Sequence, residues 1–133
     1  MTGKLSLKHF SHTELCCPCC NQAALAPGFG DDLEALRFVY AKPMIATSVC
    51  RCRRHNRAIK GHIRSLHLMD NPWHETDGTC ALDIEMMSSP DRARLIGLAL
   101  TRGWSIGVAS NFLHLDRRSR YIGLPQVVFH YSR

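Results

Sequence analysis

Two stretches of the chain repeat apolar residues at the spacing of an amphipathic helix. Residues 31–40 place acidic side chains in the first turn and apolar ones at positions 33, 36, 39 and 40, with Pro43 just beyond. This pattern predicts a helix packed against a core. Residues 89–101 begin with Ser89 as N-cap, carry a proline in the first turn and end before Gly103, which predicts a second helix.

Strands are predicted where short apolar segments alternate with polar residues. Because successive side chains of a strand point to opposite faces, Leu82 and Ile84 should face the core while Asp83 faces the other way. By the same rule, His114 and Asp116 should lie together on the face opposite their apolar neighbours. The expected strands cover residues 44–47, 81–84, 104–108 and 112–116.

Shorter helices complete the expected elements. One is expected within residues 6–15, opening at Ser6 or Ser11, and a basic one over residues 53–60. Helices and strands are segregated along the chain and joined by short connections. This arrangement predicts an α+β fold, with a small antiparallel sheet and flanking helices.

Length and composition favour a globular protein. A chain of 133 residues corresponds to a single domain spanning 1–133, with the cysteine-rich segment 1–30 packed on it. The apolar share of 45% argues against disorder. The longest apolar run, residues 95–100, is too short to span a membrane, and the first eight residues lack the apolar segment of a secretory signal.

The net charge of +6 describes the surface rather than the fold. Basic residues are spread along the chain, with small clusters at 51–54 and 117–120. No aromatic–basic nucleic-acid motif accompanies them, so no nucleic-acid partner is expected.

Three residues from separate places form a candidate metal site. His67, Asp83 and His114 supply two imidazoles and one carboxylate. A catalytic zinc takes such a set of three protein ligands and keeps a fourth position for water. His74 and Asp77, in the polar segment between the first two ligands, are the alternative ligands; that segment is otherwise interpreted as a lid or surface flap.

The order of these motifs resembles the zinc D-alanyl-D-alanine carboxypeptidase family of bacteria and phages, which shares its fold and metal site with the hedgehog signalling domain. The resemblance covers roughly residues 5–120, and it implies a zinc peptidase with a hedgehog-like fold. The matching motifs, in chain order, are Lys8-His9-Phe10-Ser11, Ser48-Val49-Cys50-Arg51 with Asn56, Ser65-Leu66-His67, Ala81-Leu82-Asp83 and His114-Leu115-Asp116.

The chain departs from the family pattern at two points near the ligands. His67 and Asp83 lie sixteen positions apart, where the family usually has seven, and residues 69–77 make up the surplus. Thr79 stands where the family has its turn glycine, and Gly78 comes one position early. Surface loops tolerate such added length at a small entropic cost.

The resemblance also implies roles around the metal. Arg51 corresponds to the arginine that holds the substrate's terminal carboxylate, a task that suits its planar fork. Ser65 is expected to line the substrate site and to hydrogen-bond locally before His67. Relatives usually carry an acidic general base shortly before the last histidine, but here Asn111 occupies that region. Asp116 is therefore the candidate base, or else it orients a ligand imidazole or pairs with a neighbouring arginine.

Seven cysteines indicate a second metal or disulfides. Two overlapping C-x₂-C pairs lie within residues 16–20, and a third close pair lies at 50 and 52. Thiolates at this spacing can hold a structural zinc, for which Cys16, Cys19, Cys50 and Cys52 are the candidate ligands. Disulfides or reduced, packed thiols are the alternatives.

We therefore expect a monomeric zinc metallopeptidase that acts on peptidoglycan peptides, either as a D-Ala-D-Ala carboxypeptidase or as an L-Ala-D-Glu endopeptidase. It would be a phage-type lysis enzyme, made in the cytoplasm and acting on the cell wall after release. The alternatives are a non-catalytic, metal-bound binding protein of the same fold and a cysteine–zinc nucleic-acid-binding module.

Overall fold

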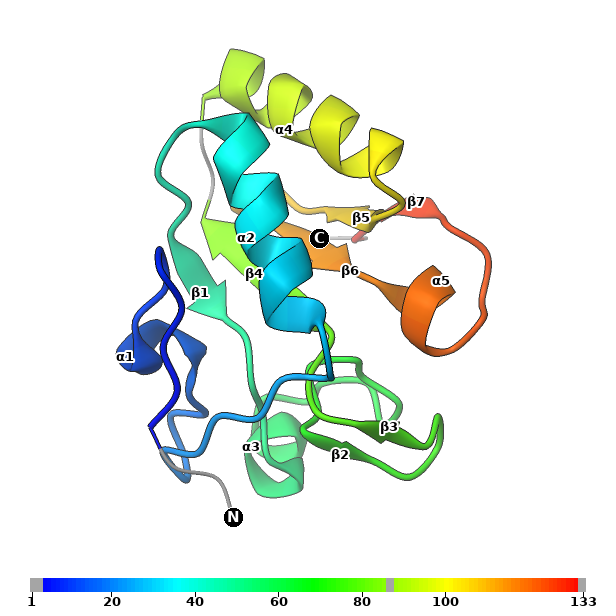
Figure 1. The fold of residues 1–133 in the computed structure, drawn as a ribbon. Helices are drawn as coiled ribbons and strands as arrows, with labels where there is room; N and C mark the ends of the chain where they lie inside the picture. The colour runs from blue at the N-terminus through cyan, green and yellow to red at the C-terminus, as the bar shows by residue number, and fades with distance from the viewer. Residues whose placement is uncertain (1–3, 86–87, 132–133) are drawn as a thin grey trace.

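A five-stranded sheet in the order β1–β4–β6–β5–β7 runs through the computed structural model, which describes residues 4–85 and 88–131 (Figure 1). All neighbouring strands are antiparallel except β5 and β7, which are parallel. The strands are β1 (Ala46–Ser48), β4 (Ala81–Glu85), β5 (Ser105–Val108), β6 (Phe112–Asp116) and β7 (Val128–His130). The predicted α+β class is confirmed. The pattern did not predict β7 or its parallel pairing, and β1 begins two residues later than expected.

The helices largely follow the sequence pattern. They are α1 (His12–Leu15), α2 (Phe29–Tyr40), α3 (Arg53–Ala58), α4 (Ser89–Thr101) and α5 (Arg118–Tyr121). Ser11 opens α1 with a capping box, in which its hydroxyl accepts from the Glu14 N–H and the Glu14 carboxylate accepts from the Ser11 N–H. The N-cap of α4 is Ser88 and not Ser89, because the Ser88 hydroxyl accepts the N–H of Asp91. The short helix α5 was not predicted.

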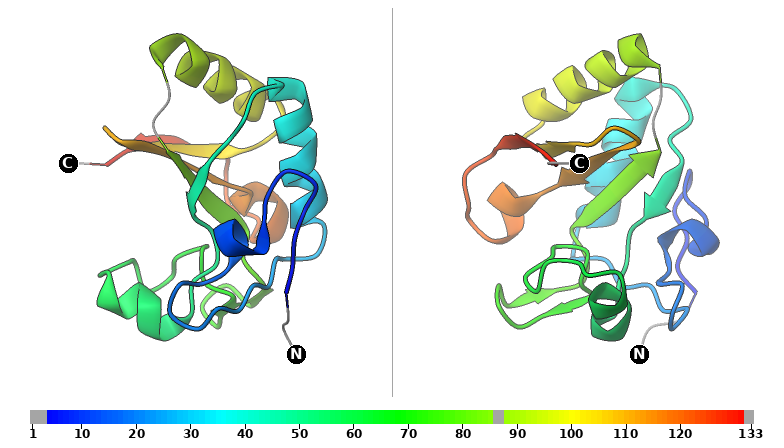
Figure 2. Two further views of the ribbon diagram at one scale, coloured as in Figure 1. Left: turned by 90° about the vertical axis from the view of Figure 1, so that its left-hand side faces the viewer. Right: turned by 180° about the vertical axis from the view of Figure 1, so that it is seen from behind.

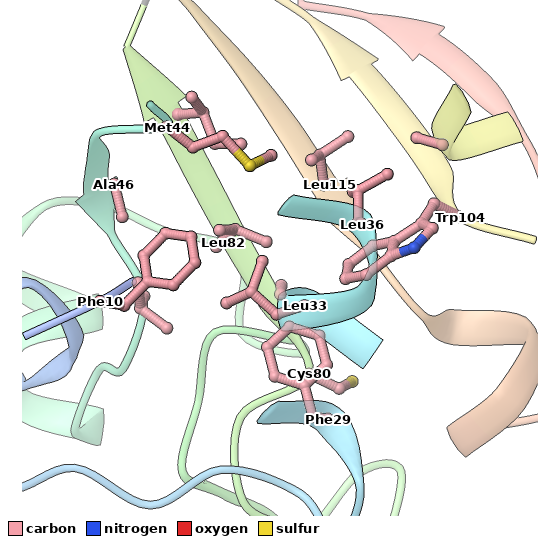
Figure 3. Close-up of a cluster of buried hydrophobic side chains, with 14 of the residues drawn as sticks. Phe10, Phe29, Leu33, Leu36, Met44, Ala46, Cys80, Leu82, Trp104 and Leu115 are labelled. Atoms are coloured by element: carbon pink, nitrogen blue, oxygen red, sulfur yellow. The ribbon is translucent and has the colours of Figure 1, made fainter. Parts of the chain in front are cut away.

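The core lies between α2 and one face of the sheet (Figure 3). Leu33 and Leu36 of α2 face Leu82 of β4 and Leu115 of β6, and all four side chains are fully buried. Burying a leucine side chain of this kind stabilises the fold by about 1.5–3 kcal/mol. This apolar contact fixes which face of each central strand turns inward.

The opposite face of β4 and β6 carries the polar residues, as the alternation predicts. It is turned to the viewer in the right-hand view of Figure 2, with α2 behind the sheet and α5, α3 and a small hairpin around it. That hairpin consists of β2 (Asp70–Asn71) and β3 (Thr76–Asp77). It is the structure adopted by the surplus residues between the first two predicted ligands.

The segment before α2 packs against the same core. Phe10 and Leu15 are buried, and the N–H of Cys50 donates to the Leu15 carbonyl. Residues 1–3, part of the segment in which no secretory signal is expected, lie outside the described residues. Among the helices described, none is both long and apolar enough to cross a membrane.

Candidate metal centre

His67, Asp83 and His114 come together on the polar side of the sheet. Asp83 and His114 are directly paired across the antiparallel strands β4 and β6. Asp83 Oδ1 lies 3.0 Å from His114 Nδ1 and 3.2 Å from His67 Nε2. The three donor atoms all lie within 4.8 Å of one another, and all three residues are buried. The structure thus brings together the three residues that the sequence singled out.

The connection before β4 delivers His67 to the strands. The Arg51 N–H donates to the His67 carbonyl at 2.9 Å, which ties this segment to the end of β1. The hydroxyl of Thr79 donates to the same carbonyl at 2.8 Å and is fully buried. Gly78 takes the left-handed turn with φ of +102°, where a Cβ would come within 2.4 Å of the Leu25 carbonyl carbon. Gly78 and Thr79 together therefore form a tight turn at the place where the family has its turn glycine.

In each imidazole, the ring nitrogen that points away from Asp83, here called the outer nitrogen, already has a hydrogen-bond partner. His67 Nδ1 lies 2.8 Å from the Val49 carbonyl and His114 Nε2 lies 2.8 Å from Asp116 Oδ2, so each of these nitrogens is the protonated donor. With a metal bound, both rings would be neutral, and their inner nitrogens, His67 Nε2 and His114 Nδ1, would present lone pairs beside Asp83 Oδ1. A cation between these three buried acceptors would satisfy all of them. The residues present therefore fit a divalent metal ion.

Electrostatics around the ligands agree with this arrangement. Burial by itself would raise the pKa of Asp83, but hydrogen bonds from His114 and His67 outweigh it and hold the pKa well below the usual range. Burial lowers the pKa of His67, which favours the neutral ring that a metal requires. Burial would lower the pKa of His114, but its hydrogen bonds with Asp116 and Asp83 raise it, so a metal would have to displace the ring proton that faces Asp83.

Asp116 lines the cleft beside His114, but its side chain is fully buried. Its carboxylate accepts from His114 Nε2 and, at 2.7–3.0 Å, from the guanidinium and backbone N–H of Arg118. Its cross-strand neighbours are the small residues Ala81 and Ser105. Burial would raise the pKa of Asp116, but the bonds from His114 and Arg118 lower it to about 2. The ion pair expected with a neighbouring arginine is formed with Arg118.

Arg51 reaches the same centre from the end of β1. Its guanidinium donates to Ser48 Oγ and to Asn56 Oδ1, both at 3.2 Å, and lies 3.4 Å from Asp83 Oδ2. Asn56 is itself buried and donates to the His62 carbonyl. Ser48, Asn56 and Asp83 therefore hold the guanidinium group of Arg51 beside the candidate metal ligands.

A cleft of about 570 Å³ opens over the centre. Besides the ligands, residues from five further segments line it, including Arg51, Ser65, His74, Arg118, Phe129 and Tyr131. The Ser65 hydroxyl accepts the N–H of His67 at 3.2 Å, the local bond expected of it. His74 lines the cleft, while Asp77 is exposed on the hairpin and neither joins the ligand group.

Three contributors to this site were missed from the sequence. Asn71 is buried and joins the hairpin to the turn before His67, donating to the carbonyls of residues 64 and 65 and accepting the N–H of His74. Phe129 of β7 lies beside His114, with ring centroids 5.8 Å apart. Gly107 of β5, between them, leaves room for both rings, since a Cβ there would come within 2.7 Å of Phe129. The apolar and aromatic run at 127–131 is the signal that could have revealed β7.

A second group of metal-binding side chains lies at the cysteines. The sulfur atoms of Cys17, Cys20 and Cys52 lie within 4.8 Å of one another. This corrects the predicted set, of which only Cys52 belongs to this group. The thiol of Cys16 instead faces the Thr13 carbonyl at 3.7 Å, and that of Cys50 is buried against the Ala24 carbonyl at 3.6 Å.

The protonation of these thiols differs sharply. Burial would raise the pKa of Cys52, but the N–H of His55 and hydrogen bonds from the thiols of Cys17, Cys19 and Cys20 lower it to about 7. Burial raises the pKa of Cys80, which stands alone before β4, to about 12. Cys80 is thus a buried, protonated packing thiol, whereas the lowered pKa of Cys52 favours its thiolate.

Comparison with known proteins supplies the family. No curated protein and no solved structure matches the chain significantly. A family model described as Peptidase M15 matches residues 8–116, a span that contains all three candidate metal ligands and most of the chain. The resemblance seen in the motifs is thereby confirmed. The chain belongs to the Peptidase M15 family of metallopeptidases.

Proposed function

We propose that the protein is a zinc-dependent peptidase that hydrolyses the stem peptides of peptidoglycan. The observation that carries the proposal is the meeting of three buried acceptor atoms, on His67, Asp83 and His114, at the base of an open cleft. These residues would hold the zinc, which when bound polarises the scissile carbonyl and activates a water molecule. Membership of a family whose peptidases use zinc supports the choice of metal.

The cleft wall suits an anionic peptide. Arg51 and Arg64 both line it, and stem peptides carry free carboxylates. Because Ser48 and Asn56 hold the Arg51 fork in place, little side-chain entropy would be lost when it binds a carboxylate. This arrangement favours the carboxypeptidase over the endopeptidase, with Arg51 holding the terminal carboxylate and Ser65 lining the site.

The hydrogen bonds of Asp116 support an orienting role rather than that of a general base. A carboxylate that receives the outer N–H of a ligand imidazole fixes the ring's tautomer and direction. Proton transfer would then fall to His74, which lines the cleft and whose imidazole forms no hydrogen bond or ion pair within the described part of the chain. We assign His74 as the proton acceptor.

The biological setting follows from the family branch. The opening motif at Lys8–Ser11 resembles the phage-type branch, in which such enzymes are made in the cytoplasm and reach the cell wall on lysis. A phage-type lysis enzyme is therefore the setting we propose.

The test is hydrolysis of purified muropeptides by the zinc-loaded protein, with products identified by mass spectrometry. Loss of a single terminal alanine identifies the carboxypeptidase, and cleavage after L-alanine identifies the endopeptidase. His114→Ala should lose both zinc and hydrolysis. His130→Ala, which removes an exposed histidine of β7, is the matched control and should lose neither.

One observation favours a non-catalytic, metal-bound binding protein as the second candidate. Among the described residues lining the cleft, the only carboxylates are Asp83 and Asp116, and both are engaged by histidine and arginine. Zinc retained at full occupancy without cleavage of any muropeptide would select this candidate and refute the peptidase.

A further inference from the structure

The cysteine-rich segment and the start of α3 lie side by side at one end of the molecule (Figures 1 and 2). The backbone N–H of Cys52 donates to Cys17 Sγ at 3.4 Å, which joins two segments 35 positions apart. Sulfur atoms of Cys17, Cys20 and Cys52 converge there within 4.8 Å. The exposed Cys19 thiol lies outside this group, and the neighbouring Cys52 raises its pKa.

Two backbone hydrogen bonds close the turn that contains Cys17 and Cys20. The Cys17 N–H donates to the Gln22 carbonyl at 2.8 Å, and the Asn21 N–H donates to the Cys17 carbonyl at 2.7 Å. Asn21 adopts the left-handed conformation, with φ of +60°, that this closure requires. Of the two overlapping C-x₂-C pairs, the turn therefore directs Cys17 and Cys20 toward Cys52.

Backbone N–H groups donate hydrogen bonds to the sulfur atoms. Cys17 Sγ accepts from Cys52, Cys52 Sγ accepts from His55 at 3.3 Å, and Cys20 accepts from Gln22. Such bonds stabilise negative charge on sulfur and orient it, as partners outside the ligand set do at metal sites. Arg54 adds positive charge next to Cys19. Four thiolates around a divalent ion carry a net charge of −2, which this basic surrounding compensates.

We propose that Cys17, Cys19, Cys20 and Cys52 bind a structural zinc ion, separate from the His67–Asp83–His114 centre. Tetrahedral zinc with Zn–S bonds of about 2.3 Å places sulfur atoms about 3.8 Å apart. The sulfur atoms of Cys17, Cys20 and Cys52 need only a small contraction to reach that geometry, and the exposed Cys19 thiol would turn in as the fourth ligand. Cys16 and Cys50, whose thiols face backbone carbonyls elsewhere, take no part.

The position of this zinc gives it a structural task. Cys52 directly follows Arg51, whose N–H and carbonyl pair with His67 and Met69. A metal cross-link at Cys52 would therefore hold the segment that supports both the carboxylate-binding arginine and the first ligand of the other centre. It would also anchor the N-terminal segment, in which the short helix α1 is the one helix before α2 among residues 4–28.

The test uses cobalt as a spectroscopic probe of the full-length protein. Tetrahedral cobalt bound to thiolates gives a strong sulfur-to-metal charge-transfer band in the near ultraviolet, which a His₂Asp site lacks. We expect two metal ions per wild-type chain by elemental analysis, together with this band. His114→Ala should keep the band and lose one metal. The charge-transfer band would therefore persist even if the peptidase proposal failed.

Two variants on the same turn provide the decisive comparison. Cys20→Ser should abolish the band and lose one metal, whereas Cys16→Ser, from the other C-x₂-C pair, should keep both. Should Cys20→Ser not fold, cobalt titration of the wild type still decides the matter. A wild-type chain without the band overturns the proposal: thiol titration then finds fewer than seven free thiols if disulfides form, or all seven if they are simply reduced.

Discussion

Replacing Asp116 separates two of the three roles predicted for this carboxylate, orienting a ligand imidazole and acting as general base. In Asp116→Ala, the outer N–H of His114 loses its acceptor, and the Arg118 guanidinium loses its ion pair. If Asp116 orients the ligand imidazole, zinc affinity should fall by roughly 10–100-fold, or about 1.4–2.7 kcal/mol. Loss of the buried partner should also lower the free energy of unfolding by about 1–3 kcal/mol.

Asp116→Asn refines the comparison. Its amide oxygen can still accept from His114 Nε2, so zinc affinity should lie between those of the wild type and Asp116→Ala. Zinc binding is measured by competition with a chromophoric chelator, and kcat is measured on muropeptides at saturating zinc. A general base behaves differently, because both variants would then lose roughly 10²–10⁴-fold in kcat while zinc affinity stayed unchanged. That result would refute the orienting role.

Three further variants test other parts of the structure. His74→Ala should lower kcat by about 100-fold with zinc content unchanged, and an unaltered rate would rule His74 out as the proton acceptor. In Gly107→Ala the new Cβ would stand 2.7 Å from the Phe129 ring and 3.1 Å from His114 Cβ, so urea denaturation should show a loss of about 1–3 kcal/mol together with weaker zinc binding. Leu33→Ala, at a fully buried position of α2, should cost about 2–5 kcal/mol in the same assay without changing the zinc stoichiometry of the folded protein, and a smaller loss would contradict the packing described for the core.

Local patterns in the sequence were sufficient for the main helices and for the two strands that carry metal ligands. The alternation around Asp83 and His114 correctly separates a buried apolar face from a polar one, because strand geometry turns neighbouring side chains to opposite sides. The order of the ligand motifs was equally readable. These features depend only on residue type and spacing within a few positions.

Features that depend on distant contacts could not be predicted. β7 joins the sheet beside β5 through a parallel pairing that no local pattern specifies, and it brings Phe129 to the metal centre. The burial of Asp116 follows from its cross-strand register with Ala81 and Ser105. Register depends on how the apolar faces of both strands pack against α2, so it emerges only when the sheet is assembled.

The cysteines show the same division most clearly. Spacing alone indicated a metal site or disulfides, but two overlapping pairs satisfied the same motif equally well. The structure brings Cys17 and Cys20 together with Cys52, a residue 32 positions beyond Cys20. The sequence by itself determined which chemical groups the protein has and where its main helices and central strands lie. The tertiary structure alone decided which groups meet, because ligand geometry is set by long-range packing and turn conformation rather than by spacing along the chain.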